Sequence, residues 1–259
     1  MSHRLVTATI LAVALAAVLW GCAAPEPRQP LPPDALTLEE EIALGRAAAP
    51  LVEKDLGGEL DALAVQAYVG TIGQRVARAT RLSGLPYRFT VLDSPEPHAV
   101  ALPGGVIGVT RGLLGRLETE AQLAAALARP LAHLAAGHVR RGLTDRFALA
   151  VLRRAAMAGL DVPAGRSGDP EAVRRVAELL ADPSYTDAQQ GEADRLGLDY
   201  VAAAGYNPQQ MAVCLQRLGA AGPRIDAVRT LAARKYADRG GRIADEVYSR
   251  EVLDRLQKP

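Results

Sequence analysis

Few side chains in this chain of 259 residues could perform metal chemistry. Its histidines and cysteines are His3, His98, His133, His138, Cys22 and Cys214. Histidines four residues apart on a helix share one face and can bind one metal ion together. His133 and His138 are five residues apart, about 140° around a continuous helix, so we expect them not to meet at one ion. His98 could lie close enough to His133 for a two-histidine site, and this alternative stays open.

The pattern of residue types predicts the elements that position these side chains. Strands are predicted over three segments: 87–92, 99–102 and 106–110. A glycine-rich turn over 103–105 joins the last two strands. Helices are predicted over 37–49, over 60–80, from Thr119 onward, over 171–181, over 187–204, from Pro208 onward, and in a last segment that ends near 256. The first helix begins with a Thr37–Glu40 capping box and should end before Pro50. The layout is α+β, with a small sheet among many helices.

Composition excludes several classes of protein. Hydrophobic residues make up 49% of the chain, which excludes intrinsic disorder and allows a core without metal or disulfide cross-links. The formal net charge is +1, from 30 basic and 29 acidic residues, so charge gives no reason to expect a nucleic-acid partner. Cys214 lies in a helical apolar stripe and is predicted to be a small buried hydrophobic residue.

The first residues have the pattern of a secretory leader. A basic start, Met1 to Arg4, precedes an apolar run over 5–19 that is too short for a comfortable membrane span. The run ends in Leu-Trp-Gly-Cys22, which resembles the bacterial lipobox, so we predict a signal peptide over 1–21 and a lipid on Cys22. The alternative is an uncleaved anchor with an incidental cysteine. Prolines make 22–36 a stiff spacer, and one domain should cover 37–259, with a helical tail over 219–259.

Three segments in order resemble a known family. They are His98–Leu114, Glu192–Leu198 and Gly205–Pro208. Together they closely resemble the zinc metalloendopeptidases related to HtpX and the CAAX prenyl protease, and most closely the periplasmic, outer-membrane-associated BepA-like proteins. The resemblance spans about 36–218. It implies a mostly helical, zincin-like domain with a small sheet, in which the edge strand 99–102 lies beside the helix that carries the active site.

In that family, zinc is held by a His-Glu-x-x-His helix and by a glutamate four residues before an aspartate. Counting from 110–114 gives the matching positions in this chain, which are Arg129, Pro130, His133, Gln190 and Asp194. Arg129 stands at the position of the first ligand. Pro130 stands at the position of the general base, and Gln190 stands at the position of the third ligand. His133 is then the retained ligand position. Glu192 points about 200° away from Gln190 on a helix and cannot simply replace it. The resemblance therefore implies no catalytic residues and no cofactor here, although the family uses zinc.

These observations predict a catalytically inactive, lipid-anchored periplasmic homologue that binds client or partner polypeptides in envelope protein assembly or quality control. Strand addition to an edge uses main-chain hydrogen bonds and needs no metal. The predicted peptide groove consists of His98, Ala99, Val100, Ala101, Leu102, Gly104 and Gly105. Two alternatives stay open: a folded relic with an empty groove, and an active metalloendopeptidase with an unusual metal site on His133 and Asp194. The leader places the protein on the periplasmic face of a bacterial membrane, and Ala23-Ala24 after the cysteine favours the outer membrane.

Overall fold

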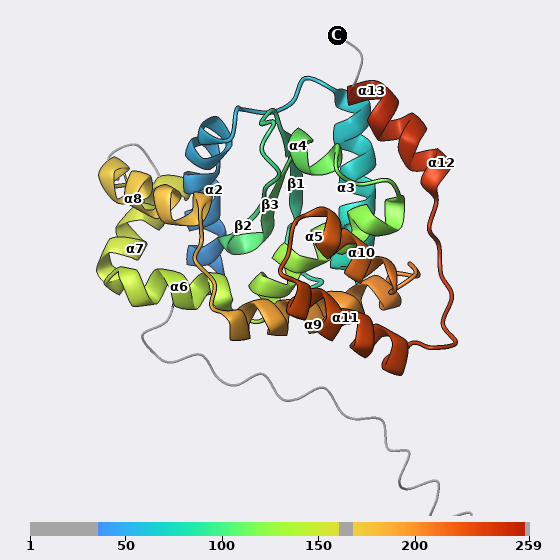
Figure 1. The fold of residues 1–259 in the computed structure, drawn as a ribbon. Coiled ribbons are helices and arrows are strands. Elements are labelled where there is room, and N and C mark those ends of the chain that lie inside the picture. The colour runs from blue at the N-terminus through green and yellow to red at the C-terminus, as the bar shows by residue number, and fades with distance from the viewer. Residues whose placement is uncertain (1–35, 161–167, 257–259) are drawn as a thin grey trace, which may run out of the picture. The chain divides into compact units, whose positions relative to one another are not determined.

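The computed structural model describes residues 36–160 and 168–256, in which helices surround a small three-stranded sheet (Figure 1). This confirms the α+β prediction. The predicted signal peptide, Cys22 and the spacer up to residue 35 lie outside the described residues, as does most of the predicted loop over 161–170. Within the described ranges, no helix combines the length and apolar character that a membrane span requires.

The sheet has the strand order β1-β3-β2. Its strands are β1 (Arg88–Leu92), β2 (Ala99–Leu102) and β3 (Val106–Thr110). The central strand β3 runs parallel to β1 and antiparallel to β2, with Val100 opposite Gly108. The turn η1 (Pro103–Gly105) joins β2 to β3 as predicted. Gly104 has φ 73°, a left-handed value that glycine adopts readily, and a Cβ there would lie 2.4 Å from Ile42 Cα. The turn therefore packs directly on the first helix, and β2 is left at the edge of the sheet.

The helices before the sheet are α2 (Leu38–Asp55) and α3 (Leu63–Ala77). The helices after it are α4 (Arg111–Leu114), α5 (Glu120–Ala135), α6 (His138–Arg146), α7 (Leu149–Ala156), α8 (Pro170–Ala181), α9 (Asp187–Ala203), α10 (Gln210–Arg217) and α11 (Gly222–Lys235). The chain ends in α12 (Asp245–Tyr248), a π-helical turn η3 (Ser249–Leu253) and α13 (Asp254–Leu256), and a 3₁₀ turn η2 (Met157–Gly159) follows α7.

Helix α2 begins at its predicted cap but continues further than predicted. Thr37 and Glu40 exchange side-chain to backbone hydrogen bonds, so the capping box is confirmed. The predicted end before Pro50 is wrong, because α2 continues to Asp55. Proline already has a helical φ, and its cost is limited to the hydrogen bond that its missing N–H would have made and to local crowding. Burial of Val52, which lies beyond the proline, stabilises the longer helix.

Helix α5 lies at the centre of the fold. It packs against α9, α10, α3 and strand β2 (Figure 1). Its predicted apolar stripe is buried throughout: Leu123, Leu127, Leu131 and Leu134. Thr119 accepts a hydrogen bond from the backbone of Gln122, so the predicted start is confirmed. The helix runs through Pro130 without interruption. Gly197 of α9 faces Ala128 of α5, where a Cβ would lie 3.6 Å away, so this small residue lets the two helices approach closely.

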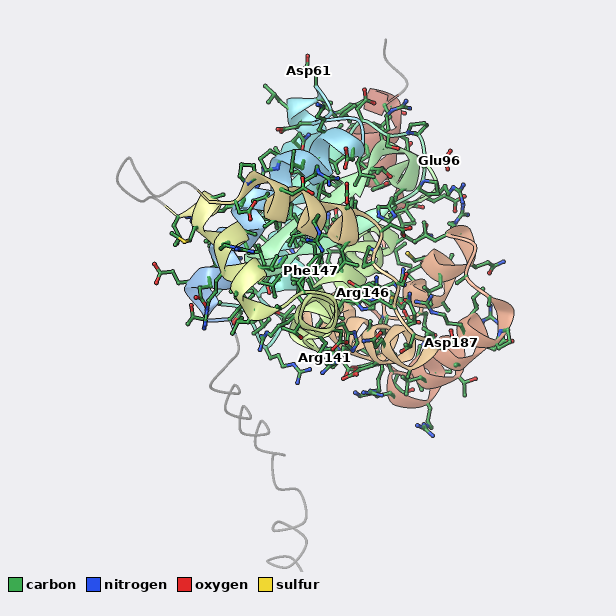
Figure 2. The ribbon with its side chains drawn as sticks, turned by 90° about the vertical axis from the view of Figure 1, so that its left-hand side faces the viewer. Asp61, Glu96, Arg141, Arg146, Phe147 and Asp187 are labelled. Atoms are coloured by element: carbon green, nitrogen blue, oxygen red, sulfur yellow. The ribbon has the colours of Figure 1, made fainter. Side chains whose placement is uncertain are left out.

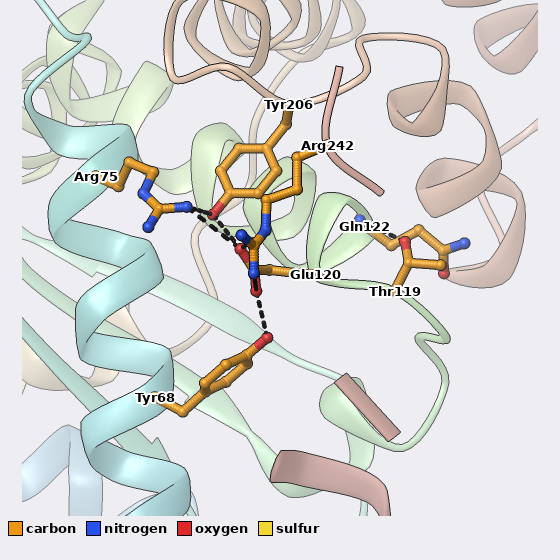
Figure 3. A network of polar contacts seen from close by, with 7 residues as sticks. All are labelled: Tyr68, Arg75, Thr119, Glu120, Gln122, Tyr206 and Arg242. Carbon is orange, nitrogen blue, oxygen red and sulfur yellow. Dashed lines mark hydrogen bonds and ion pairs between the residues drawn. The ribbon is translucent and has the colours of Figure 1, made fainter. Parts of the chain in front are cut away.

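A buried carboxylate at the start of α5 connects distant parts of the chain. Glu120 is 1% exposed. It accepts hydrogen bonds from the Tyr68 hydroxyl at 2.6 Å, the Tyr206 hydroxyl at 2.7 Å and Arg242 Nη2 at 3.0 Å, and Arg75 Nη1 lies 3.4 Å away (Figure 3). Burial alone would raise the pKa of Glu120, but the hydrogen bonds from the two tyrosines and Arg242 outweigh burial and hold that pKa below its usual range. The network therefore stabilises an ionised carboxylate in the core.

The tail is attached at the same place. The backbone N–H of Glu120 donates to the carbonyl of Ala244 at 3.2 Å, and that of Ala121 donates to the carbonyl of Ile243 at 3.1 Å. The first N–H groups of a helix have no partner within the helix, so these tail carbonyls satisfy two of them. The segment before α12 thus closes the N-terminal end of α5.

Candidate functional site

The residues singled out by sequence lie where α5 faces α9. Arg129 and His133 are four residues apart on α5 and therefore share one face. Gln190 and Asp194 have the same spacing on α9. Close packing of α5 and α9 brings the two faces together.

Arg129 joins the two helices. Its Nε donates to Asp194 Oδ1 at 3.1 Å, and its Nη2 donates to Gln190 Oε1 at 2.8 Å. Arg224 of α11 donates to the same aspartate through Nε and through Nη2, the latter at 2.7 Å from Oδ1. Two guanidinium groups therefore share one carboxylate. Burial and the positive charge of Arg224 lower the pKa of Arg129, but a guanidinium stays charged in proteins.

The two histidine side chains contact each other, which their helical spacing did not predict. His133 Nδ1 and His138 Nδ1 are 2.9 Å apart. The expectation assumed one continuous helix, but α5 ends at Ala135 and α6 begins only at His138. Between them, Gly137 has φ 74°, and this left-handed residue turns the chain so that the second imidazole faces the first. The glycine before His138 was the signal in the sequence that could have predicted the break.

The surroundings of the histidines keep both rings neutral. Burial, followed by the charge of Arg129, lowers the pKa of His133 to about 3. Burial also lowers the pKa of His138, although a bond to Glu192 partly offsets it. His138 Nε2 lies 3.2 Å from Glu192 Oε2, and because a carboxylate only accepts, this nitrogen carries the proton. His138 Nδ1 then accepts from the Nδ1–H of His133. The ring of Tyr185 stacks on His133 with 3.7 Å between centroids.

These donors do not fit a zinc ion. Zinc in proteins is bound by thiolate, imidazole and carboxylate groups. Arg129 instead places a permanent positive charge between the helices, hydrogen-bonded to Gln190 and Asp194, and Gln190 offers an amide. The Nδ1 atoms of the two histidines are bonded to each other. Among the described residues, no group of three or more histidine, cysteine or acidic side chains is arranged to hold a metal ion. Cys214 is buried as predicted, and burial raises the pKa of its thiol to about 12.

The predicted peptide groove is closed in this structure. The His98 ring is hydrogen-bonded at another place than His133: its Nε2 lies 2.8 Å from the carbonyl oxygen of Ala181, at the end of α8. Helices α5 and α8 both pack against β2. Most of the predicted groove is buried: Val100, Ala101, Leu102, Gly104 and Gly105. A peptide could therefore reach the edge of β2 only if a neighbouring element moved.

A cavity of about 180 Å³ lies beside the histidines. It is lined by residues of α6, of the end of α8 and of the segment that leads into α9: His138, Val139, Gly142, Leu143, Asp145, Arg146, Leu179, Leu180, Pro183, Ser184, Tyr185, Thr186 and Gln189. Arg141 and Arg146 of α6 are exposed side chains (Figure 2). Sequence reasoning missed this cavity, Tyr185 and Arg224, because nothing in the local pattern places these segments against α5.

Comparison with known proteins gives a consistent result. Residues 63–235 match the model of peptidase family M48. The beta-barrel assembly-enhancing protease of Yersinia pestis is 27% identical over 212 residues, which cover 74% of this chain and 42% of that protein. The mitochondrial metalloendopeptidase OMA1 of Arabidopsis thaliana is 27% identical over 146 residues, or 56% of this chain and 28% of that protein. The metalloprotease LoiP of Escherichia coli strain K12 is 24% identical over 142 residues, or 55% of each chain. The chain spans less than two thirds of the length of each of these relatives.

Proposed function

The chain belongs to peptidase family M48, and we propose that it is a catalytically inactive member that binds polypeptides instead of cleaving them. The observation that carries this proposal is the Arg129 guanidinium, which is hydrogen-bonded to Gln190 and Asp194 between α5 and α9. By the motif positions matched in the sequence, Arg129 and Gln190 stand where the family has zinc ligands.

Three positions count against ordinary zinc peptidase chemistry. A zinc site with good ligands contributes on the order of 10 kcal/mol or more, and that value depends on neutral or anionic donors. Arg129 and Gln190 replace two of those donors with a cation and an amide. Pro130 replaces the general base, whose loss alone typically costs about 10²–10⁴-fold in rate.

The alternative, an active metallopeptidase with an unusual site on His133 and Asp194, is disfavoured. Both carboxylate oxygens of Asp194 accept hydrogen bonds from arginines, and His133 is bonded to His138. Binding a metal ion at Asp194 would require displacing the arginines from its carboxylate oxygens. It would also place the metal ion beside two guanidinium groups.

We place this binding role on the periplasmic face of a bacterial membrane, in envelope protein assembly or quality control. The leader pattern and the lipobox-like Cys22 support a lipid anchor in the outer membrane. The names of the relatives in Yersinia pestis and in Escherichia coli, beta-barrel assembly-enhancing proteases, support a role in assembly.

Metal analysis combined with a peptidase assay tests the proposal. We expect the purified full-length protein to contain far less than one zinc per chain and to cleave no unfolded protein, such as labelled casein, in a chelator-sensitive way. The same protein should bind that unfolded substrate in a fluorescence anisotropy titration. One equivalent of zinc that disappears in a His133→Ala variant, together with chelator-sensitive cleavage, would establish an active enzyme instead.

A further inference from the structure

We propose that the two arginines at this site bind a carboxylate, and that this carboxylate is the free C-terminal end of a bound polypeptide. The inference rests on the proposed polypeptide binding and specifies which part of the polypeptide is recognised.

The first argument is the charge of the site. Arg129 and Arg224 supply two positive charges, and Asp194, between them, supplies one negative charge. The two neutral histidines add none. Glu192 is the next carboxylate along α9, but two residues along a helix place it on a different face from Asp194, where it binds His138. The face that carries the arginines therefore has an uncompensated positive charge.

The second argument is the supply of hydrogen-bond donors. Arg129 and Arg224 each use Nε and Nη2 to bind their partners. Their Nη1 groups make no hydrogen bond to any residue in the described ranges. The side chains are 21% and 24% exposed, so solvent reaches both. Guanidinium groups bind carboxylates through short, charge-assisted hydrogen bonds, which are about twice as strong as neutral ones.

The third argument is the cavity beside the histidines, which Tyr185 connects to the face of α5 that carries Arg129. Tyr185 lines the cavity and stacks on His133, which shares one face of α5 with Arg129. Gln189 also lines the cavity, and Gln190 beside it binds Arg129. The cavity volume is about 180 Å³, and its walls combine valine, leucine and tyrosine side chains with polar ones, so it suits one large side chain with an apolar body. A C-terminal residue offers a carboxylate and such a side chain on the same Cα.

The fourth argument concerns the edge of the sheet. An internal segment that binds by strand addition needs an open edge, and β2 is buried beneath α5 and α8. A chain end needs no such edge. Acidic side chains also supply a carboxylate, so the experiment has to distinguish a chain end from an internal aspartate.

Three labelled peptides make that distinction with the full-length protein. All have ten residues of a serine and glycine sequence that ends in phenylalanine, with fluorescein at the N-terminus. The first has a free C-terminal carboxylate, the second an amidated end, and the third an amidated end and one internal aspartate. We expect fluorescence anisotropy at low salt to show the free acid binding at least tenfold more tightly than either amide.

Two variants with matched controls connect binding to the site. Arg224→Gln should reduce the preference for the free acid to less than threefold, whereas Arg229→Gln, on the exposed side of the same helix, should leave it unchanged. Gly142 lines the cavity, and a Cβ at that position would meet no atom within 4 Å, so Gly142→Phe should fill the cavity without disturbing α6. We expect Gly142→Phe to weaken binding of the free-acid peptide at least tenfold, and Gly142→Ala to weaken that binding much less.

The outcomes separate the inference from the proposed function. Equal binding of the free acid and the simple amide would overturn carboxylate recognition and leave polypeptide binding intact. Tight binding of the amidated aspartate peptide would show that the site recognises acidic side chains and not chain ends. Failure of all three peptides and of unfolded casein to bind would overturn the inference and the proposed function together.

Discussion

Restoring the family's ligand pattern should convert this site into a zinc site. The triple variant Arg129→His, Pro130→Glu, Gln190→Glu gives α5 a His-Glu-x-x-His sequence and α9 a glutamate four residues before Asp194. The side chain at 190 already points at position 129, since Gln190 Oε1 lies 2.8 Å from Arg129 Nη2. Asp194 keeps its bonds to Arg224, so removing Arg129 does not leave a buried carboxylate without a partner. We expect one zinc per chain.

The size of the effect follows from ligand linkage. Zinc at about one hundred times its dissociation constant raises the free energy of unfolding by about 2.7 kcal/mol. For a domain of this size, that corresponds to a rise in Tm of about 5–10 °C. Removing a proline from the helix interior also stabilises α5, by up to about 3 kcal/mol, and this effect does not depend on metal. Thermal melts of the same variant with zinc and with chelator therefore isolate the contribution of the metal.

The control is the triple variant with His133→Ala added, which should bind zinc far more weakly. If the triple variant folds, as judged by circular dichroism, yet its Tm does not respond to zinc, the positional reading of Arg129, Pro130 and Gln190 is wrong. A wild-type Tm that falls on addition of chelator would refute it equally well.

Three further predictions concern buried polar groups. Glu120→Gln should lower the free energy of unfolding by about 3 kcal/mol, because a buried carboxylate with four partners is replaced. Since the folded pKa of Glu120 is depressed, its contribution to wild-type stability is fully present above pH 4.5 and is lost as pH falls from there through the lower folded pKa. A variant with an unchanged urea midpoint would contradict this. The pKa of His133 is about 3 in the folded protein against 6.5 when unfolded, so the free energy of unfolding of the wild type should fall by about 2 kcal/mol from pH 6.5 to pH 5. His133→Asn should flatten this dependence on pH. An unchanged dependence in the variant would show that another group causes it. His98→Ala removes the bond to the Ala181 carbonyl and should speed hydrogen exchange in α8, whereas His98→Gln, which can keep a donor there, should not; equal exchange in both would show that this bond does not hold α8.

Local features of the fold could be predicted from sequence because neighbouring residues determine them. The Thr37 cap of α2 and the turn at Gly104 depend on residues within a few positions, and both are as expected. A predicted helix end was wrong where packing a few residues further along outweighed the local signal. Helix α2 was predicted to end before Pro50, but it continues to Asp55 because Val52, beyond the proline, is buried.

The site could be predicted only in part. The resemblance singled out Arg129, Gln190 and Asp194, and the packing of α5 against α9 brings these three side chains into contact. The contacts that complete it come from a break at Gly137 and from segments far away in sequence, which supply Tyr185 and Arg224. Helical arithmetic cannot anticipate a left-handed residue that ends the helix. The placement of loops against α5 results from packing of the whole core.

Replacing a metal ion by a side-chain cation changes what such a site can do. A guanidinium attached to α5 connects α5 to α9 with a positive charge that no chelator can remove. It has no vacant coordination position, so it cannot take a water molecule and lower its pKa as a bound metal ion does. All of its hydrogen-bonding groups are N–H donors, so any ligand that it binds must be an acceptor, and a carboxylate is the strongest acceptor on a polypeptide. On the function proposed above, the substitution that removes the means of cleaving a chain would also supply the means of holding its end.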